Sequence, residues 1–119
     1  MIKNYIIEEK SFQFAVRIVK LHRFLTTEKS EHTLSKQLLR CGTSIGANVA
    51  EAQNGQSLAD FTSKMNIALK EATETKYWLR LLQAADYLSD VQFNSVYSDC
   101  VEIEKILVKI VKSSKPHKI

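Results

Sequence analysis

Apolar residues recur every three or four positions through most of the 119-residue chain, and this spacing predicts amphipathic α-helices. Four such segments, separated by short polar breaks, cover about residues 11–26, 31–53, 58–87 and 90–113. The second segment shows the pattern most clearly, with apolar or small side chains at Leu34, Leu38, Cys41, Ile45, Val49 and Ala52. The hydrophobic pattern therefore predicts an all-α protein.

The polar breaks carry residues that are typical of helix ends. Asn54 and Gly55 suit the C-terminus of a helix, and Ser89 followed by Gln92 resembles a capping box at an N-terminus. Loops of about two to five residues make successive helices antiparallel. We therefore predict an antiparallel up-down-up-down four-helix bundle that forms one domain over residues 1–119.

The composition supports this fold class. Three glycines and one proline are too few for the many turns of a β-sandwich or a β-barrel. No apolar run approaches the roughly 18 residues of a membrane span, and the first residues carry charge where a signal peptide needs an apolar segment. These observations predict a cytoplasmic protein.

The chain shows no pattern that is typical of a catalytic or metal site. Cys41 and Cys100 are far apart and lack the Cys-x-x-Cys spacing of zinc and redox sites. The three histidines are scattered, and none forms a metal-binding H-E-x-x-H motif. Glu71 and Glu74 are three positions apart, but the Glu-x-x-His partner of a di-iron site is missing. The sequence predicts no enzymatic activity, no cofactor and no metal.

Charge changes this picture because it is unevenly distributed. The net charge of +4 divides into +4 over residues 1–50, −5 over residues 51–104 and +5 over residues 105–119. A basic end can bind nucleic acid, or it can lie in solvent and complement a helix dipole. The candidate nucleic-acid-binding residues are Arg17, Lys20, Arg23, Lys105, Lys109 and Lys112. Since no aromatic residue alternates with these lysines, we expect contacts to phosphates and not to bases.

Polar residues also border the apolar stripes of the second and third predicted helices. This candidate structural network comprises Arg40, Ser44, Asn48, Glu51, Glu71 and Glu74. A charge at a buried border needs a partner, so Arg40 and Asn48 are expected to meet Glu71 or Glu74 across the two helices. The alternative is that these side chains extend to water at the edge of the stripe.

Two further features suggest association between subunits. The third helix has a second apolar stripe, and the second helix carries small residues on a line that would allow close backbone approach. The second stripe contains Ile67, Trp78, Leu81 and Ala85, and the line of small residues contains Gly42, Gly46 and Ala50. These features favour a homo-oligomer. The alternative is that the third helix is the central helix of a monomer.

Two longer blocks carry a resemblance to a known family. Residues 37–52 contain the string SIGANVAE at 44–51, and the block that begins at Phe61 contains IALKEATETKYWLR at 67–80. Over nearly its whole length the chain resembles the four-helix-bundle family that includes the 23S ribosomal RNA intervening-sequence proteins and the accessory proteins of diversity-generating retroelements. The resemblance implies an antiparallel bundle assembled into a homopentameric ring, with a basic surface proposed to meet nucleic acid. For most members of that family the biological role is unknown.

Two functions therefore stay open. The first is an oligomer that binds RNA or DNA through phosphate contacts, which predicts steep dependence on salt. The second is an oligomeric scaffold that binds a protein partner, in which case the basic residues are solvated and RNA does not compete with that partner.

Overall fold

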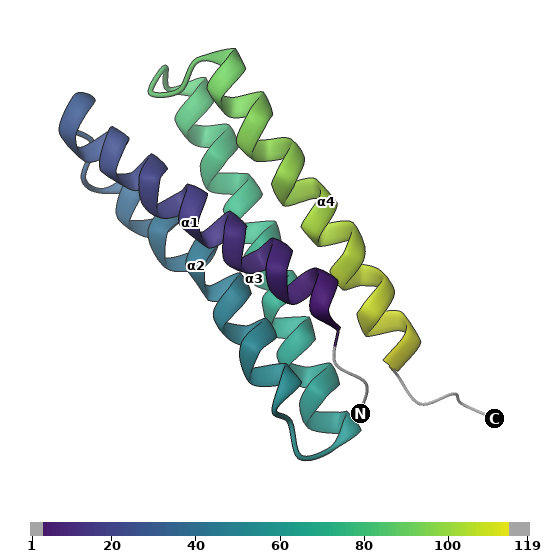
Figure 1. The fold of residues 1–119 in the computed structure, drawn as a ribbon. Coiled ribbons are helices and arrows are strands. Elements are labelled where there is room, and N and C mark those ends of the chain that lie inside the picture. The colour runs from purple at the N-terminus through teal and green to yellow at the C-terminus, as the bar shows by residue number, and fades with distance from the viewer. Residues whose placement is uncertain (1–3, 115–119) are drawn as a thin grey trace.

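The computed structural model describes residues 4–114, which form four α-helices joined by short loops (Figure 1). The helices are α1 (Tyr5–Glu28), α2 (Leu34–Gln53), α3 (Leu58–Ala84) and α4 (Asp90–Ser114). No strand occurs between residues 4 and 114. The all-α fold class and the four predicted helices are therefore confirmed.

Each helix packs against the next helix along the chain, and α4 also contacts α1. Successive helices run in opposite directions, so the start of α1 and the end of α4 lie at the same end of the bundle (Figure 1). Two ion pairs between α2 and α3 agree with the opposite directions of these helices. Arg40, early in α2, pairs with Glu74 late in α3. Glu51, near the end of α2, pairs with Lys64 near the start of α3.

One apolar stripe from each helix forms the core. Its largest fully buried side chains include Phe14, Ile18, Leu38, Ile45, Met65, Leu79, Leu82, Ile103 and Leu107. Burying a side chain of this size stabilises the fold by about 1.5–3 kcal/mol relative to leaving it in water. The stripes that the sequence pattern identified are therefore the ones that meet at the centre of the bundle.

Gly42 and Gly46 allow α1 to pack closely on α2. A Cβ atom at Gly42 would lie 2.8 Å from Cγ1 of Ile18, and a Cβ atom at Gly46 would lie 3.1 Å from the backbone oxygen of Ser11. A glycine inside a helix lowers stability by about 0.5–1 kcal/mol relative to alanine. Here the close packing of α1 on α2 within the same chain explains why glycine occupies these two positions. These two glycines therefore do not support the subunit interface that the sequence suggested.

The N-terminus of α1 lies six residues before the predicted start at Ser11. Asn4 caps the helix by accepting a hydrogen bond from the amide of Ile7 at 3.3 Å, and Ile7 is fully buried. Gln53, at the end of α2, exchanges two hydrogen bonds with the backbone of Asn4. The predicted start was wrong because the first turn is fixed by a cap and by a contact with a distant helix.

The C-terminus of α3 lies three residues before the predicted end at Tyr87. Asp86 has a φ angle of 67°, in the left-handed region that ends a helix. The amide of Asp86 donates to the carbonyl of Gln83 at 3.0 Å, and the amide of Tyr87 donates to that of Leu82 at 2.9 Å. These two bonds form a Schellman motif, which the local sequence does not reveal because the left-handed residue is not glycine.

Glu31 lies outside α2, although the prediction placed it as the first residue of that helix. Its side-chain carboxylate accepts hydrogen bonds from the amides of Thr33, Leu34 and Ser35 at 3.2, 2.9 and 2.7 Å. Burial by itself would raise the pKa of Glu31, but these amide donors hold that pKa below the ordinary value of 4.5. The carboxylate therefore replaces a conventional cap at the positive end of the helix.

We predict that Glu31→Gln lowers the free energy of unfolding by about 1.5–3 kcal/mol near neutral pH, the range for hydrogen bonds to a charged group. The folded-state pKa is depressed, so the ionised carboxylate stabilises the protein above the unfolded-state pKa. That stabilisation is lost as the pH falls through the lower folded-state value. Urea denaturation of both proteins at neutral and acidic pH tests this, and a difference that does not shrink in acid would contradict it.

Candidate functional site

The three predicted basic residues of α4 lie on the face of the helix that points away from the core. Lys105, Lys109 and Lys112 are exposed, whereas Leu107 and Ile110 between them are buried. None of the three lysines forms an ion pair with another residue in the range 4–114. They therefore present three uncompensated positive charges in an i, i+4, i+7 row.

The basic residues of α1 do not extend this row. The guanidinium of Arg17 donates to Asp99 at 2.5 Å and to the backbone oxygen and hydroxyl of Ser95, so it holds α1 to α4. Its charge is compensated, and the expectation that Arg17 is available to a phosphate is not supported. Lys20 and Arg23 are exposed one and two turns further along α1.

Ion pairs separate the two basic groups. Arg17 pairs with Asp99, and Lys10 pairs with Glu102 at 2.7 Å, so the α1–α4 seam is neutral along this stretch. Lys20 lines a hollow with Val91 and Gln92, so Lys20 and, one turn further along α1, Arg23 lie on the N-terminal side of this seam on α4. The lysine row continues on its C-terminal side. The six candidate residues therefore form two separate groups and not one patch.

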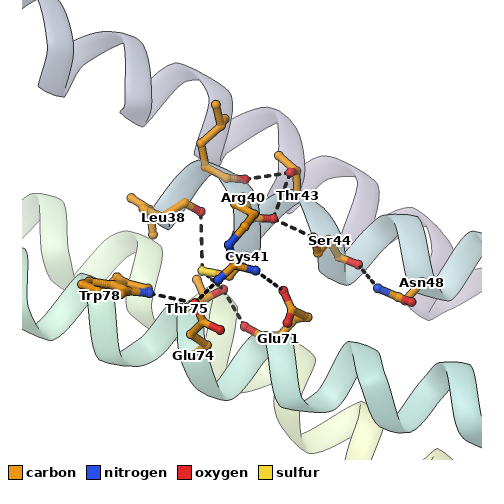
Figure 2. A network of polar contacts seen from close by, with 11 residues as sticks. Leu38, Arg40, Cys41, Thr43, Ser44, Asn48, Glu71, Glu74, Thr75 and Trp78 are labelled. Carbon is orange, nitrogen blue, oxygen red and sulfur yellow. Dashed lines mark hydrogen bonds and ion pairs between the residues drawn. The ribbon is translucent and has the colours of Figure 1, made fainter. Parts of the chain in front are cut away.

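A polar cluster joins α2 to α3 (Figure 2). The guanidinium of Arg40 donates to Glu71 at 3.3 Å and to Glu74, and the indole nitrogen of Trp78 donates to Glu74 at 3.0 Å. The side chain of Arg40 is 50% exposed, and those of Glu71 and Glu74 are 19% and 36% exposed. The cluster thus lies at the border of the core, where one arginine bridges two carboxylates.

Asn48 does not take part in this cluster. Its amide donates to the carbonyl oxygen of Ser44 at 2.8 Å, and the hydroxyl of Ser44 donates to that of Arg40 at 2.7 Å (Figure 2). Both side chains are short and satisfy their donors within α2, so the predicted contact of Asn48 with the glutamates of α3 is wrong. Glu51 pairs instead with Lys64, at 2.9 Å.

A buried layer lies beneath Arg40. The hydroxyl of Thr75 donates to the carbonyl oxygen of Glu71 at 2.7 Å, and its oxygen lies 3.3 Å from the sulfur of Cys41. Burial raises the pKa of Cys41 to about 11 and the pKa of Cys100 to about 12. Both thiols are protonated at neutral pH, and only the thiolate is a strong nucleophile. The two cysteines therefore act as small core residues.

Sequence analysis missed one ion pair between α3 and α4. Lys76 donates to Glu104 at 2.8 Å, and both side chains are more than two-thirds buried. The hydrogen bond from Lys76 to this carboxylate raises the pKa of the amine. The sequence pattern did not mark Lys76 and Glu104 as partners, because they lie on different helices, 28 positions apart. By contrast, the hydrogen bond from Trp78 to Glu74 could have been predicted from the sequence, because the two residues are four positions apart on one helix.

Between residues 4 and 114, no three His, Cys, Asp or Glu side chains come together in a way that could hold a metal ion. None of the four helices, over the residues described, is both long and apolar enough to cross a bilayer.

We predict that Glu74→Ala lowers the free energy of unfolding by about 1–2 kcal/mol. Arg40 loses one of its two carboxylates, and Trp78 loses its hydrogen-bond acceptor. Glu74→Gln keeps an oxygen for Trp78 and is expected to cost under about 1 kcal/mol. Chemical denaturation of the three proteins measures both changes. A loss of about 3–5 kcal/mol for the alanine variant would indicate a fully buried pair and would contradict the half-exposed geometry.

Comparison with known proteins agrees with the fold. The 23S rRNA-intervening sequence protein family matches residues 3–109. A crystal structure of a protein of unknown function from the S23 ribosomal protein family of Bacteroides thetaiotaomicron has a TM-score of 0.91 and 52% sequence identity. The match covers 93% of this chain and 99% of that one. No functionally curated protein matches significantly. Both the sequence match and the shared fold lead to one conclusion: the chain belongs to the 23S rRNA-intervening sequence protein family.

Proposed function

We propose that this protein is a non-enzymatic, oligomeric four-helix bundle that binds the phosphate backbone of RNA or DNA through Lys105, Lys109 and Lys112. One observation carries the proposal. These three lysines are exposed in one row on α4, and none of them forms an ion pair within residues 4–114. Other cations of the bundle, such as Arg17, Arg40 and Lys76, are held by carboxylates.

The spacing of the lysine row suits a polyanion. Lys105 and Lys112 are about 10 Å apart along the helix axis, at 1.5 Å per residue. Each lysine that neutralises a phosphate releases condensed counterions, which makes binding favourable at low salt and weak at high salt. Such contacts carry little sequence information. The expected ligand is therefore a nucleic-acid backbone with little preference for base sequence.

Assembly of the antiparallel bundle into a homopentameric ring, which the family resemblance implies, would strengthen this binding. A ring repeats the lysine row once per subunit, so several weak contacts act on one nucleic acid. Exposed apolar side chains supply surface for the contacts between subunits. Those most exposed on α1 and α3 are Tyr5 at 71%, Ile6 at 66%, Phe12 at 62% and Tyr77 at 58%.

A scaffold for a protein partner is the second candidate function. A groove of about 420 Å³ lies between α1 and α2, and Phe12 borders it above a floor of small side chains. That floor includes Ala15, Gly46, Ala47 and Ala50. An apolar helix of a partner fits such a groove. In this case the lysine row would be solvated, and nucleic acid would not compete with the partner.

We predict that Lys109→Glu combined with Lys112→Glu abolishes retention of a labelled RNA in gel retardation at low salt. The slope of log affinity against log salt should flatten by about 0.7–0.9 for each lost phosphate contact. Lys29→Glu combined with Lys36→Glu is the matched control. It makes the same charge change at two exposed positions at the other end of the bundle. Equal loss in both variants would indicate an unspecific effect of net charge and would contradict the assigned site.

We also predict that native mass spectrometry at micromolar protein concentration detects an oligomer, with five subunits if the ring forms. The Lys109→Glu and Lys112→Glu variant should keep that subunit number, because the two lysines lie on the outward face of α4. A monomer in the wild type would contradict the oligomer. A change of subunit number in the variant would show that the lysine row belongs to a subunit contact.

A further inference from the structure

An aromatic ring lies in the same hollow as the lysine row. A shallow hollow of about 690 Å³ follows the outward side of α4, and Lys105 and Lys109 line one part of it. Tyr97 and Val101 line the preceding part, so the four side chains form one i, i+4 row along the helix. The sequence predicted phosphate contacts only, because no aromatic residue alternates with Lys105, Lys109 and Lys112. The helix nevertheless places Tyr97 two turns before Lys105.

The ring of Tyr97 is held in place before any ligand arrives. It stacks on Phe93 with the ring centroids 4.7 Å apart and the planes at 26°, and it is partly buried. A ring that is already ordered loses little conformational entropy when a planar group packs against it. Asn94 and Ser98, which also line the hollow, are exposed and carry groups that can form hydrogen bonds.

The charge of the hollow suits an anion. Lys105 and Lys109 contribute two positive charges that have no partner between residues 4 and 114. The one carboxylate in the lining, Glu102, is held by Lys10 of α1 at 2.7 Å. Lys10, which lies outside the lining of the hollow, therefore compensates the negative charge of Glu102. The electrostatic potential near Lys105 and Lys109 stays positive.

We infer that this hollow binds single-stranded nucleic acid, with a base against Tyr97 and phosphates on Lys105 and Lys109. The inference rests on the proposed function and adds the class of ligand. A base in a duplex is stacked between its neighbours, whereas a single strand can turn a base face toward an aromatic side chain. From Asn94 to Lys109 the hollow extends about 22 Å along the helix, enough for a short stretch of strand.

Fluorescence polarisation tests this with a labelled oligouridylate of about 12 nucleotides, within the site sizes usual for single-strand binders, and with an RNA duplex of the same length. Tyr97→Leu removes the aromatic face but fills the space beside Phe93, and Tyr97→Phe keeps the face. Tyr77→Ala is the control, because Tyr77 is 58% exposed on α3 and lies outside the hollow. Thermal melting checks that each variant folds.

We expect Tyr97→Leu to weaken binding of the single strand about 5- to 150-fold, since stacking of a base contributes about 1–3 kcal/mol. Tyr97→Phe should stay within about twofold of the wild type, as should Tyr77→Ala, because each keeps the aromatic face of the hollow. Binding of the duplex should not change in any of the three variants.

Three results would overturn the inference, and they differ in what they say of the proposed function. If Tyr97→Leu binds the single strand like the wild type while Lys109→Glu with Lys112→Glu does not bind, stacking is excluded and phosphate binding stands. If the wild type retains neither the single strand nor the duplex at low salt, both proposals fail and the protein scaffold is favoured. A Tyr97→Phe variant as weak as Tyr97→Leu would also overturn stacking, because it would assign the effect to the hydroxyl.

Discussion

The structure depends on the need of four amphipathic helices to bury one apolar stripe each. No helix of this chain can remove its stripe from water alone, so the four stripes meet in one core that contains side chains such as Phe14, Leu38, Leu79 and Leu107. The polar side chains must then lie on the borders and on the outward faces of the bundle. This division places most charged groups between residues 4 and 114 in one of two settings, a seam between helices or an open helix face.

Charges at the seams are mostly paired. Arg40 joins α2 to α3, Lys76 joins α3 to α4 through Glu104, and Arg17 joins α1 to α4 through Asp99. Pairs as exposed as Arg17–Asp99 and Arg40–Glu74 contribute little to stability, about 0–1 kcal/mol each. These ion pairs matter for function because they neutralise cations that the composition alone would count as free to bind an anion. The lysine row on α4 retains its positive charge because its residues point away from both neighbouring helices.

Family membership establishes the fold more firmly than the activity. The protein with 52% identity is itself described as having unknown function. Nucleic-acid binding is therefore proposed from local features of α4, namely the lysines that have no ion-pair partner between residues 4 and 114 and the hollow that Lys105 and Lys109 share with Tyr97. In the proposed oligomer these contacts would be repeated once per subunit, and the exposed aromatic side chains on α1 and α3 would supply surface for contacts with another protein chain.

The sequence by itself determined the fold class, the four helices and the core, because periodicity reports directly which face of a helix is buried. The start of α4 at residue 90 was also predicted, since the capping box from Ser89 to Gln92 is a local signal, and both of its hydrogen bonds are present. The pairing of Arg40 with Glu71 and Glu74 followed from their position beside the apolar stripes.

Only the tertiary structure decided which candidate residues can act together. Arg17 and Lys109 are equally basic in the sequence, but a carboxylate on α4 takes up the charge of Arg17. Gly42 and Gly46 suggested a contact between subunits, but α1 of the same chain fills the space above them. The N-terminus of α1 depends on Gln53, 49 residues away. In each case the deciding partner is distant along the chain, and a periodic pattern carries no information about which residue of another helix lies opposite.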